Sequence, residues 1–295
     1  MLKAILISSL DKVFLDTKIN TLEPLYSAST YRNTTFSFQI AMTETACDAA
    51  HRRFVGISLD GIEQSAVTLR TVELIPSNMP AYPTRYDTEY VRTTPGLYPD
   101  LLQPLQMEGR VPCVMGQTRT VWVDIDTSAL PDGKNDIKVN VIDGEATYTL
   151  TLALNVIPAS LPEVDFPVTQ WFHYDCLASY YNVPVFSDRH WEIVENFMKN
   201  AHRAGINLIL TPTFTPPLDT AVGDERPTVQ LVDVTVTDGK YSFCFDKLDR
   251  WVKLANKCGI ENFEIAHFFT QWGAEHAPKV MATVDGEYKR IFGWE

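Results

Sequence analysis

The sequence lacks the features that mark several large classes of protein. It has no apolar run close to the ~20 residues that cross a bilayer. Basic residues are few, with 25 Lys and Arg against 37 Asp and Glu, and the net charge is −12. A nucleic acid or an anionic membrane selects a basic face, so we predict neither as a partner.

Cysteine is also scarce. The chain has five cysteines without close paired spacing, which argues against a zinc site and a disulfide framework and favours a reducing compartment. The short apolar run 4–10 is followed by no small-x-small cleavage site, so we interpret it as an edge strand rather than part of a signal peptide. Together these observations predict a cytoplasmic protein.

Motifs for common catalytic chemistry are missing as well. The chain contains no GxSxG, no HExxH and no glycine-rich phosphate loop, so we predict no metal and no cofactor. A glycosidase normally needs two carboxyl groups, and no convincing pair is evident. The acidic residues near predicted strand ends fall in loops, without a partner that marks them. These are Asp219, Asp224, Glu225 and Glu275.

Residues 1–160 consist of short runs in which polar and apolar side chains alternate, as in strands buried on one face. The clearest runs are 35–40, 120–125, 137–141 and 147–152. Asp143-Gly144, between the last two runs, suits a tight hairpin turn. Many short strands with regular turns predict an N-terminal all-β sandwich.

The segment between Pro76 and Pro112 is rich in proline and also contains Tyr82, Tyr86, Tyr90 and Tyr98. Proline removes a ladder donor, so we predict a long ordered loop here rather than a strand. The loop either packs the sandwich against the next domain or, through Tyr98-Pro99-Asp100, reaches the rim of a site. The sequence leaves both roles open.

After a proline-rich linker at 161–167, the pattern of residues 168–295 changes to strands separated by single helices. We predict strands at 168–175, 206–210 and 263–267. One helix follows Ser187 or Asp188 and ends at Gly205, and another begins near Asp246 and ends at Gly259. This order predicts a partial α/β barrel of the TIM type with about three β/α units. Asp238-Gly239 and Asp285-Gly286 predict two hairpins within it.

A barrel carries its site at the carboxyl ends of its strands, and here those ends combine aromatic rings with hydrogen-bonding groups. An aromatic ring stacks on the apolar face of a sugar, and polar side chains bind its hydroxyls. The predicted sugar-binding residues are Trp171, His173, Tyr174, Asp175, His267, Gln271 and Trp272.

Structural roles are the alternatives for these residues. Trp171 would plug the barrel, the histidines would be structural, and Asp175 would cap a loop. We interpret Glu264 as structural and the helical Trp191 and Trp251 as core.

Four blocks of sequence carry a resemblance to a known family. They are RTTPGLYPDLLQPL (92–105), QWFHYDCLASYY (170–181), LTPTFTPPLDTAVGDERPTVQLVDV (210–234) and HFFTQWGAEHAPKVMATVDGEYKRIFGWE (267–295). The chain resembles bacterial proteins with a β-sandwich and a (β/α)8 domain that is similar to glycoside hydrolase family 123. The characterised members of that family are β-N-acetylgalactosaminidases.

The resemblance implies substrate-assisted retaining hydrolysis. The acetamido oxygen of the substrate attacks the anomeric carbon, an Asp orients that group, and an adjacent Glu is the acid/base. No Asp-Glu pair matches at a strand end here, because Asp224-Glu225 lies in a loop. Residues 168–295 are also short of the ~250 of a complete barrel. We therefore expect a truncated chain that lacks the catalytic pair and that is poorly stable alone or self-associates.

Two hypotheses follow. The first is the N-terminal part of a glycoside hydrolase that acts on a β-linked N-acetylhexosamine, with an N-acetylgalactosaminide favoured. The second is a non-catalytic carbohydrate-binding or scaffolding protein with the same fold. Both predict a glycan partner, and an Asp-Glu pair at a later strand end would favour the first.

Overall fold

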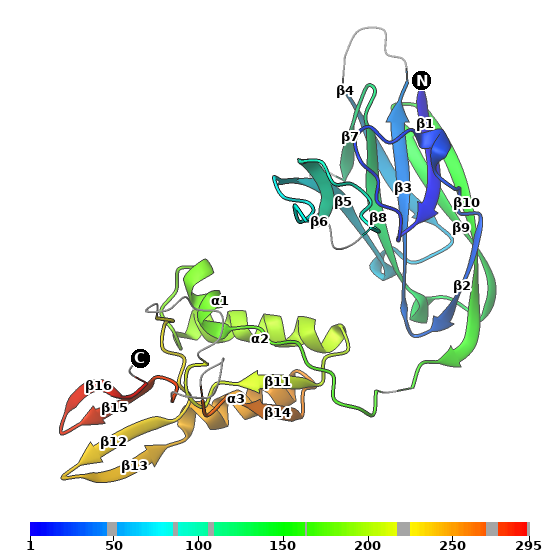
Figure 1. The fold of residues 1–295 in the computed structure, drawn as a ribbon. Helices are drawn as coiled ribbons and strands as arrows, with labels where there is room; N and C mark the ends of the chain where they lie inside the picture. Colours follow the sequence, from blue (N-terminus) through cyan, green and yellow to red (C-terminus); the bar gives the residue numbers. More distant parts are fainter. Residues whose placement is uncertain are drawn as a thin grey trace. The chain divides into compact units, whose positions relative to one another are not determined.

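The computed structural model describes residues 1–45, 52–84, 88–105, 109–162, 164–216, 225–269 and 277–293 (Figure 1). The chain divides into two compact units, Met1–Pro162 and Glu163–Glu295. Strands outnumber helices throughout. No helix in these ranges is long and apolar enough to cross a membrane.

The first unit consists of two five-stranded sheets. One has the order β1 (Leu2–Ser8), β3 (Thr35–Glu44), β8 (Thr118–Asp126), β5 (Val67–Ser77) and β6 (Gly96–Pro104). The other has the order β2 (Ser27–Arg32), β10 (Ala146–Ser160), β9 (Gly133–Asp143), β4 (Arg52–Asp60) and β7 (Arg110–Val114). Among the named strand pairs of this unit, β2 and β10 run parallel and the others antiparallel. Three short 3-10 turns connect strands: η1 (Ile19–Thr21), η2 (Gln64–Ala66) and η3 (Thr127–Ala129).

The alternating runs of the sequence form the core between these sheets. In β8, Val121, Val123 and Ile125 are fully buried, and they share one apolar cluster with Val139 and Leu152 of the opposite sheet. The four predicted strands are confirmed as β3, β8, β9 and β10, and the first apolar run forms the edge strand β1. Period-two alternation places every second side chain on the same face, and here that face is the buried one.

The prediction of a continuous loop from Pro76 to Pro112 is wrong over its second half, which contains β6 and the start of β7. Pro99 and Pro104 are tolerated because β6 lies at the edge of its sheet, where a missing N–H breaks no ladder bond. The pairing of β6 with β5 also shifts register between Val72 and Leu74. The prolines argued against a strand, but the sequence did not show that this segment lies at a sheet edge, where proline is tolerated.

Three helices pack together in the second unit: α1 (Tyr174–Tyr180), α2 (Asp188–Arg203) and α3 (Asp246–Lys257). The Ser187 hydroxyl accepts a hydrogen bond from the backbone N–H of His190 and caps α2. Gly205 and Gly259 follow α2 and α3 with φ of 86° and 87°, a left-handed conformation that glycine adopts without strain. The predicted helices are confirmed, and Trp191 and Trp251 lie in their shared core.

The strands of this unit form two small sheets. β11 (Leu208–Thr211) and β14 (Asn262–Ile265) pair in parallel. The other sheet has the order β13 (Lys240–Cys244), β12 (Asp233–Thr237), β15 (Val280–Val284) and β16 (Glu287–Phe292). It contains the two hairpins predicted from Asp-Gly.

The predicted strand 168–175 is wrong beyond its first residues. Thr169 forms an isolated parallel bridge with Leu208, and the Val168 carbonyl accepts from the N–H groups of Asn207 and Leu208. At Tyr174 the chain enters α1, which packs the Tyr174 ring against Trp251 with centroids 4.2 Å apart. Of the three predicted barrel strands, two are thus named strands, β11 and β14, and the described residues do not establish a partial barrel.

Candidate glycan-binding site

The carboxyl ends of β11 and β14 lie at the same edge of their sheet. The two strands pair residue for residue from Leu208 with Asn262 to Thr211 with Ile265, and the N–H of Ala266 donates to the Thr211 carbonyl at 3.0 Å. The Thr169 bridge brings the segment before α1 alongside β11. Three segments distant in sequence therefore meet at this edge.

Trp171 contacts both Glu264 and His267 here, and we call these three residues the strand-end cluster. The Trp171 indole Nε1 donates to Glu264 Oε2 at 2.7 Å. The Trp171 and His267 rings meet edge to face, with centroids 4.9 Å apart. Trp171 is 43% exposed, whereas His267 Nδ1 is buried without a hydrogen bond to any described residue. The cluster presents an indole ring, a carboxylate and an imidazole together.

The sequence interpretation gave Glu264 a structural role and did not predict its contact with Trp171. Phe263 and its pairing partner Ile209 belong to the apolar cluster with the helices. Successive side chains of a strand point to opposite faces, so Glu264 lies on the other face of the sheet. The alternation around Phe263 was the available signal, but the sequence did not reveal that Trp171 would lie within hydrogen-bonding distance.

Two phenylalanines from the loops after the strands add apolar surface. The rings of Phe214 and Phe268 have centroids 5.7 Å apart, and Phe268 is exposed. Thr213 Oγ1 is buried and has no hydrogen-bond partner among the described residues. The strand ends thus combine rings with polar atoms, as the sequence predicted in general terms.

Tyr174 and Asp175 do not join the strand-end cluster, contrary to the prediction. Both are buried, and each is only 3% exposed. Tyr174 lies in the helical core, where burial raises the pKa of its phenol well above the usual value. Asp175 is held by Arg226, whose side chain is 9% exposed, with Nε to Oδ2 at 2.9 Å and Nη2 to Oδ1 at 3.2 Å. A bidentate pair of this kind occupies both carboxylate oxygens.

Arg226 connects several segments of this unit. Its guanidinium also donates to Cys176 Sγ at 3.1 Å, and its carbonyl accepts from Lys279 Nζ at 2.7 Å. Burial lowers the pKa of Lys279, although the nearby Asp175 carboxylate opposes that shift. Glu225 forms an ion pair with Arg290. The network ties α1 to the β15–β16 hairpin through Lys279 and Arg290, so Asp175 has a scaffolding role.

The remaining predicted residues are placed as follows. His173 stands at the N-cap position of α1, and its carbonyl accepts from the N–H of Cys176. Gln271 and Trp272 lie outside the described residues, as do Asp219, Asp224 and Glu275. Within the described ranges, no three His, Cys, Asp or Glu side chains gather closely enough to hold a metal ion.

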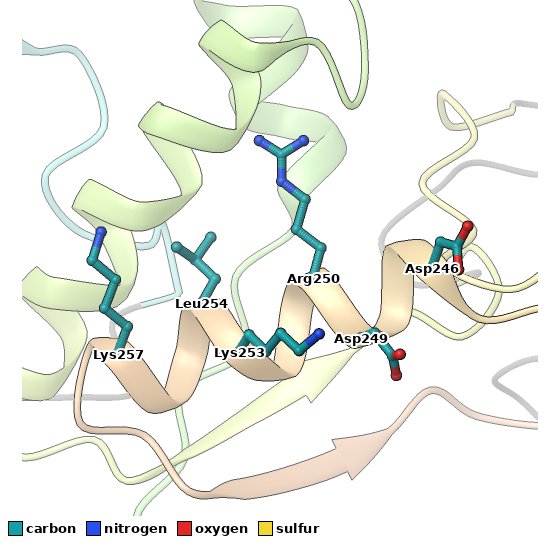
Figure 2. A pocket seen from close by; sticks show the side chains of 6 residues that line it. All are labelled: Asp246, Asp249, Arg250, Lys253, Leu254 and Lys257. Atoms are coloured by element: carbon teal, nitrogen blue, oxygen red, sulfur yellow. The ribbon is translucent and has the colours of Figure 1, made fainter.

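A groove of about 490 Å³ lies elsewhere in this unit, along α3 (Figure 2). It is lined by Asp246, Asp249, Arg250, Lys253, Leu254 and Lys257. Its lining is charged and contains no aromatic side chain, and Lys257 pairs with Glu195 at 2.8 Å. We therefore interpret it as a solvated helix face and not as the glycan site.

Two comparisons with known proteins bear on the second unit. The family model of the glycoside hydrolase 123 catalytic domain matches residues 171–294. The fold is similar to that of a family 123 glycoside hydrolase from Clostridium perfringens, studied for glycolipid glycan hydrolysis, with a TM-score of 0.73 and 14% identity. Residues 171–294 are thus similar to the catalytic domain of glycoside hydrolase family 123. Both the catalytic-domain match and the fold of the family 123 enzyme thus cover the unit that carries the strand-end cluster.

The similarity covers 99% of this chain but 52% of the clostridial enzyme, so the chain spans about half the length of that family 123 protein. Lower similarities reach a FixG-related protein from Vibrio parahaemolyticus (6% identity, 53% of this chain and 95% of that chain, TM-score 0.25). They also reach a PapD-like domain of human CEP192 (8% identity, 46% and 84%, TM-score 0.24). At these TM-scores neither similarity indicates a shared fold. Among curated proteins, none matches the sequence.

Proposed function

We propose that this chain is the sugar-binding part of a glycoside hydrolase that acts on a β-linked N-acetylhexosamine, with N-acetylgalactosamine favoured. The observation that carries the proposal is the strand-end cluster, in which Trp171 contacts both Glu264 and His267. The family match supports the reaction class. The similarity to an enzyme studied for glycolipid glycan hydrolysis supports a glycan substrate.

Each member of the cluster has a distinct task in this proposal. The exposed Trp171 indole stacks on the apolar C–H face of the sugar ring. Glu264 uses one carboxylate oxygen to fix that indole, and its other oxygen accepts from a sugar hydroxyl. His267 Nδ1 gains the hydrogen bond that it lacks among the described residues. His173, Gln271 and Trp272 stay in the proposal as further binding residues.

The proposal also includes the architecture and the mechanism. β11, β14 and the segment around Thr169 are strands of a (β/α)8 barrel, whose carboxyl ends carry the site. Hydrolysis proceeds with retention and with help from the substrate acetamido group. An Asp-Glu pair at a strand end, which the sequence of this chain does not show, supplies the protein's part. The supporting observation is that the one adjacent Asp-Glu pair after residue 168, Asp224-Glu225, lies in a predicted loop and not at a predicted strand end. We also propose a cytoplasmic location.

The alternative is a glycan-binding protein without hydrolytic activity. It is favoured by the absence of an assignable pair of catalytic carboxyl groups in the sequence. Both proposals share the sugar-binding surface, and they differ in whether a longer form of the protein releases product. An aryl N-acetyl-β-galactosaminide and the matching glucosaminide distinguish them. Binding without release of the aryl group from either compound would favour the alternative.

The binding surface is tested by titrating N-acetylgalactosamine into the chain and following saturation-transfer NMR. We expect Trp171→Ala to weaken binding roughly tenfold, or ~1.4 kcal/mol, because the stacking surface is lost. Trp122→Phe is the matched control, since the Trp122 indole also donates to a carboxylate at 2.7 Å, but in the sandwich unit. Equal binding by the wild type and Trp171→Ala would contradict the proposal.

A further inference from the structure

The four-stranded sheet of the second unit consists of two connected hairpins, which we call the double hairpin (Figure 1). Asp238-Gly239 and Asp285-Gly286 form its turns with positive φ at all four residues, as tight hairpin turns require. The N–H of Asp238 donates to Asp285 Oδ1 at 3.2 Å, which ties the turns together. β12 and β15 pair in parallel at the centre, so β13 and β16 are the edges.

One face of the double hairpin is apolar and extends to the β13 edge. Val234, Val236 and Ala282 are buried in one cluster. In the β12–β13 register, Val234 pairs with Phe243 and Val236 pairs with Tyr241. Directly paired residues share a face, so both aromatic rings continue the apolar face. Tyr241 and Phe243 are each 54% exposed, which leaves the outer end of this face uncovered by the described residues.

The two edges of the sheet differ in their protection. β16 shows a register irregularity against β15 and carries Lys289 and Arg290, and irregularities and charges of this kind discourage further pairing. β13 pairs with β12 without a register shift over five residues, and all five are exposed. It contains no proline, and its one charged residue is Lys240 at its start. An exposed, regular, aromatic edge is a template for another strand.

The direction of the backbone groups on β13 follows from its neighbours. The Val236 carbonyl accepts from the N–H of Asp285 at 2.9 Å, so it points away from β13. In an antiparallel ladder, hydrogen-bonded and non-bonded pairs alternate. Val236 and Tyr241 are therefore a non-bonded pair. Consequently Tyr241 and Phe243 direct their N–H and C=O groups to the open edge, and Ser242 directs its groups to β12.

We propose that β13 pairs antiparallel with β13 of a second copy of this chain, across a two-fold axis at Ser242. In this register Tyr241 lies opposite Phe243 of the partner subunit, and Phe243 lies opposite Tyr241 of the partner subunit. Both are bonded pairs, because all four residues have outward backbone groups. The two double hairpins then form one continuous sheet whose apolar face carries two cross-strand aromatic pairs.

A second copy fits this edge because the edge is complementary to itself. A two-fold interface brings the same residues together from both sides, and here each side offers two aromatic rings and two sets of backbone donors and acceptors. Lys240 would lie opposite Cys244 of the partner subunit, so no like charges face each other across the axis. Centring the axis on Tyr241 instead would place Phe243 opposite Gly239 of the partner subunit. Centring it on Phe243 would place Tyr241 opposite Phe245 of the partner subunit, which lies beyond the end of β13.

The proposal is tested by sedimentation velocity of the purified chain over a range of concentrations. We expect the mass to rise to twice that of a single chain. Phe243→Lys should stay monomeric, because a charge enters the aromatic pair. Tyr288→Lys is the matched control on the β16 edge and should still dimerise. Circular dichroism establishes that both variants are folded. A wild type that is monomeric throughout, one that grows beyond a dimer, or a Phe243→Lys variant that dimerises unchanged would overturn the proposal.

A cross-linking experiment tests the register independently. At a non-bonded antiparallel pair the Cα atoms are about 4.5 Å apart, which a disulfide can span. With the exposed Cys176 and Cys244 replaced by Ser, Ser242→Cys should form a covalent dimer under mild oxidation, and Lys289→Cys on β16 should not. Equal cross-linking of the two variants would overturn the register at Ser242.

Discussion

Phe38 in the first unit and Phe243 in the second are both strand residues on the apolar face of a sheet. Phe38 is fully buried because a second five-stranded sheet covers that face. Phe243 is about half exposed, since the described residues place no second layer over the outer end of the double hairpin. The same residue type is thus a core residue in one unit and a surface residue in the other.

The comparison extends to the polar groups. In the sandwich, Asp124 receives hydrogen bonds from Ser37 and Trp122 and an ion pair from Arg70, all within one sheet. In the second unit, Asp175 is paired with Arg226 from a distant segment, whereas Glu264 lies beside the exposed Trp171. The second unit therefore keeps some of its rings and polar atoms accessible, and those are the groups with which a protein binds a ligand or a partner.

Truncation of a core ring should have the largest effect. We expect Phe38→Ala to destabilise the first unit by about 3–5 kcal/mol, because it removes a fully buried ring and leaves a cavity. Phe243→Ala should cost less than ~1 kcal/mol of unfolding free energy, since its ring is already half exposed. Urea unfolding followed by hydrogen exchange of each unit measures both. Similar losses of unfolding free energy in the two variants would mean that Phe243 is covered to the same degree as Phe38.

Removal of the buried carboxylate in the second unit should have the next largest effect. Asp175→Asn leaves the Arg226 charge buried without its counter-ion, and breaking such a pair costs about 3–5 kcal/mol at most. Asp188→Asn is the control, because its pair with Arg250 at 3.5 Å is exposed and worth about 0–1 kcal/mol. Hydrogen exchange of α1 measures the effect. Unchanged exchange in Asp175→Asn would show that Asp175 is not a scaffolding residue and would restore it as a candidate ligand of the sugar.

Acid should produce the smallest effect, and it should act on the sandwich. Burial alone would raise the pKa of Asp124, but hydrogen bonds from Ser37, Arg70 and Trp122 outweigh it, and the pKa lies below the ordinary 3.8. A lowered folded-state pKa stabilises the fold above the unfolded value, and this stability is lost as pH falls through the folded value. Asp124→Asn should therefore flatten the loss of stability of the first unit below about pH 4. An unchanged acid profile would contradict this assignment.

Local patterns in the sequence were sufficient for most of the secondary structure. Alternation of apolar residues predicted β8 and β9, helical spacing with Ser187 and Gly205 predicted α2, and Asp-Gly pairs predicted both turns of the double hairpin. These signals are local because a strand or a helix repeats its buried face every two or about 3.6 residues. The prediction of a loop over residues 76–112 failed in its second half, because the position of a strand at a sheet edge is not a local property.

The sequence also predicted that the candidate site lies at the carboxyl ends of the parallel strands, but it did not predict which residues meet there. The sequence by itself determined that aromatic and polar residues follow the parallel strands, and Trp171 and His267 were identified in this way. Only the tertiary structure decided that Asp175 is neutralised by Arg226 and that Glu264 meets Trp171, across 51 and 93 residues of chain. The physical reason is that a charged or aromatic side chain takes its role from the partner that reaches it. Folding brings that partner from a distant segment, and the spacing of residues in the sequence does not show which segments will come into contact.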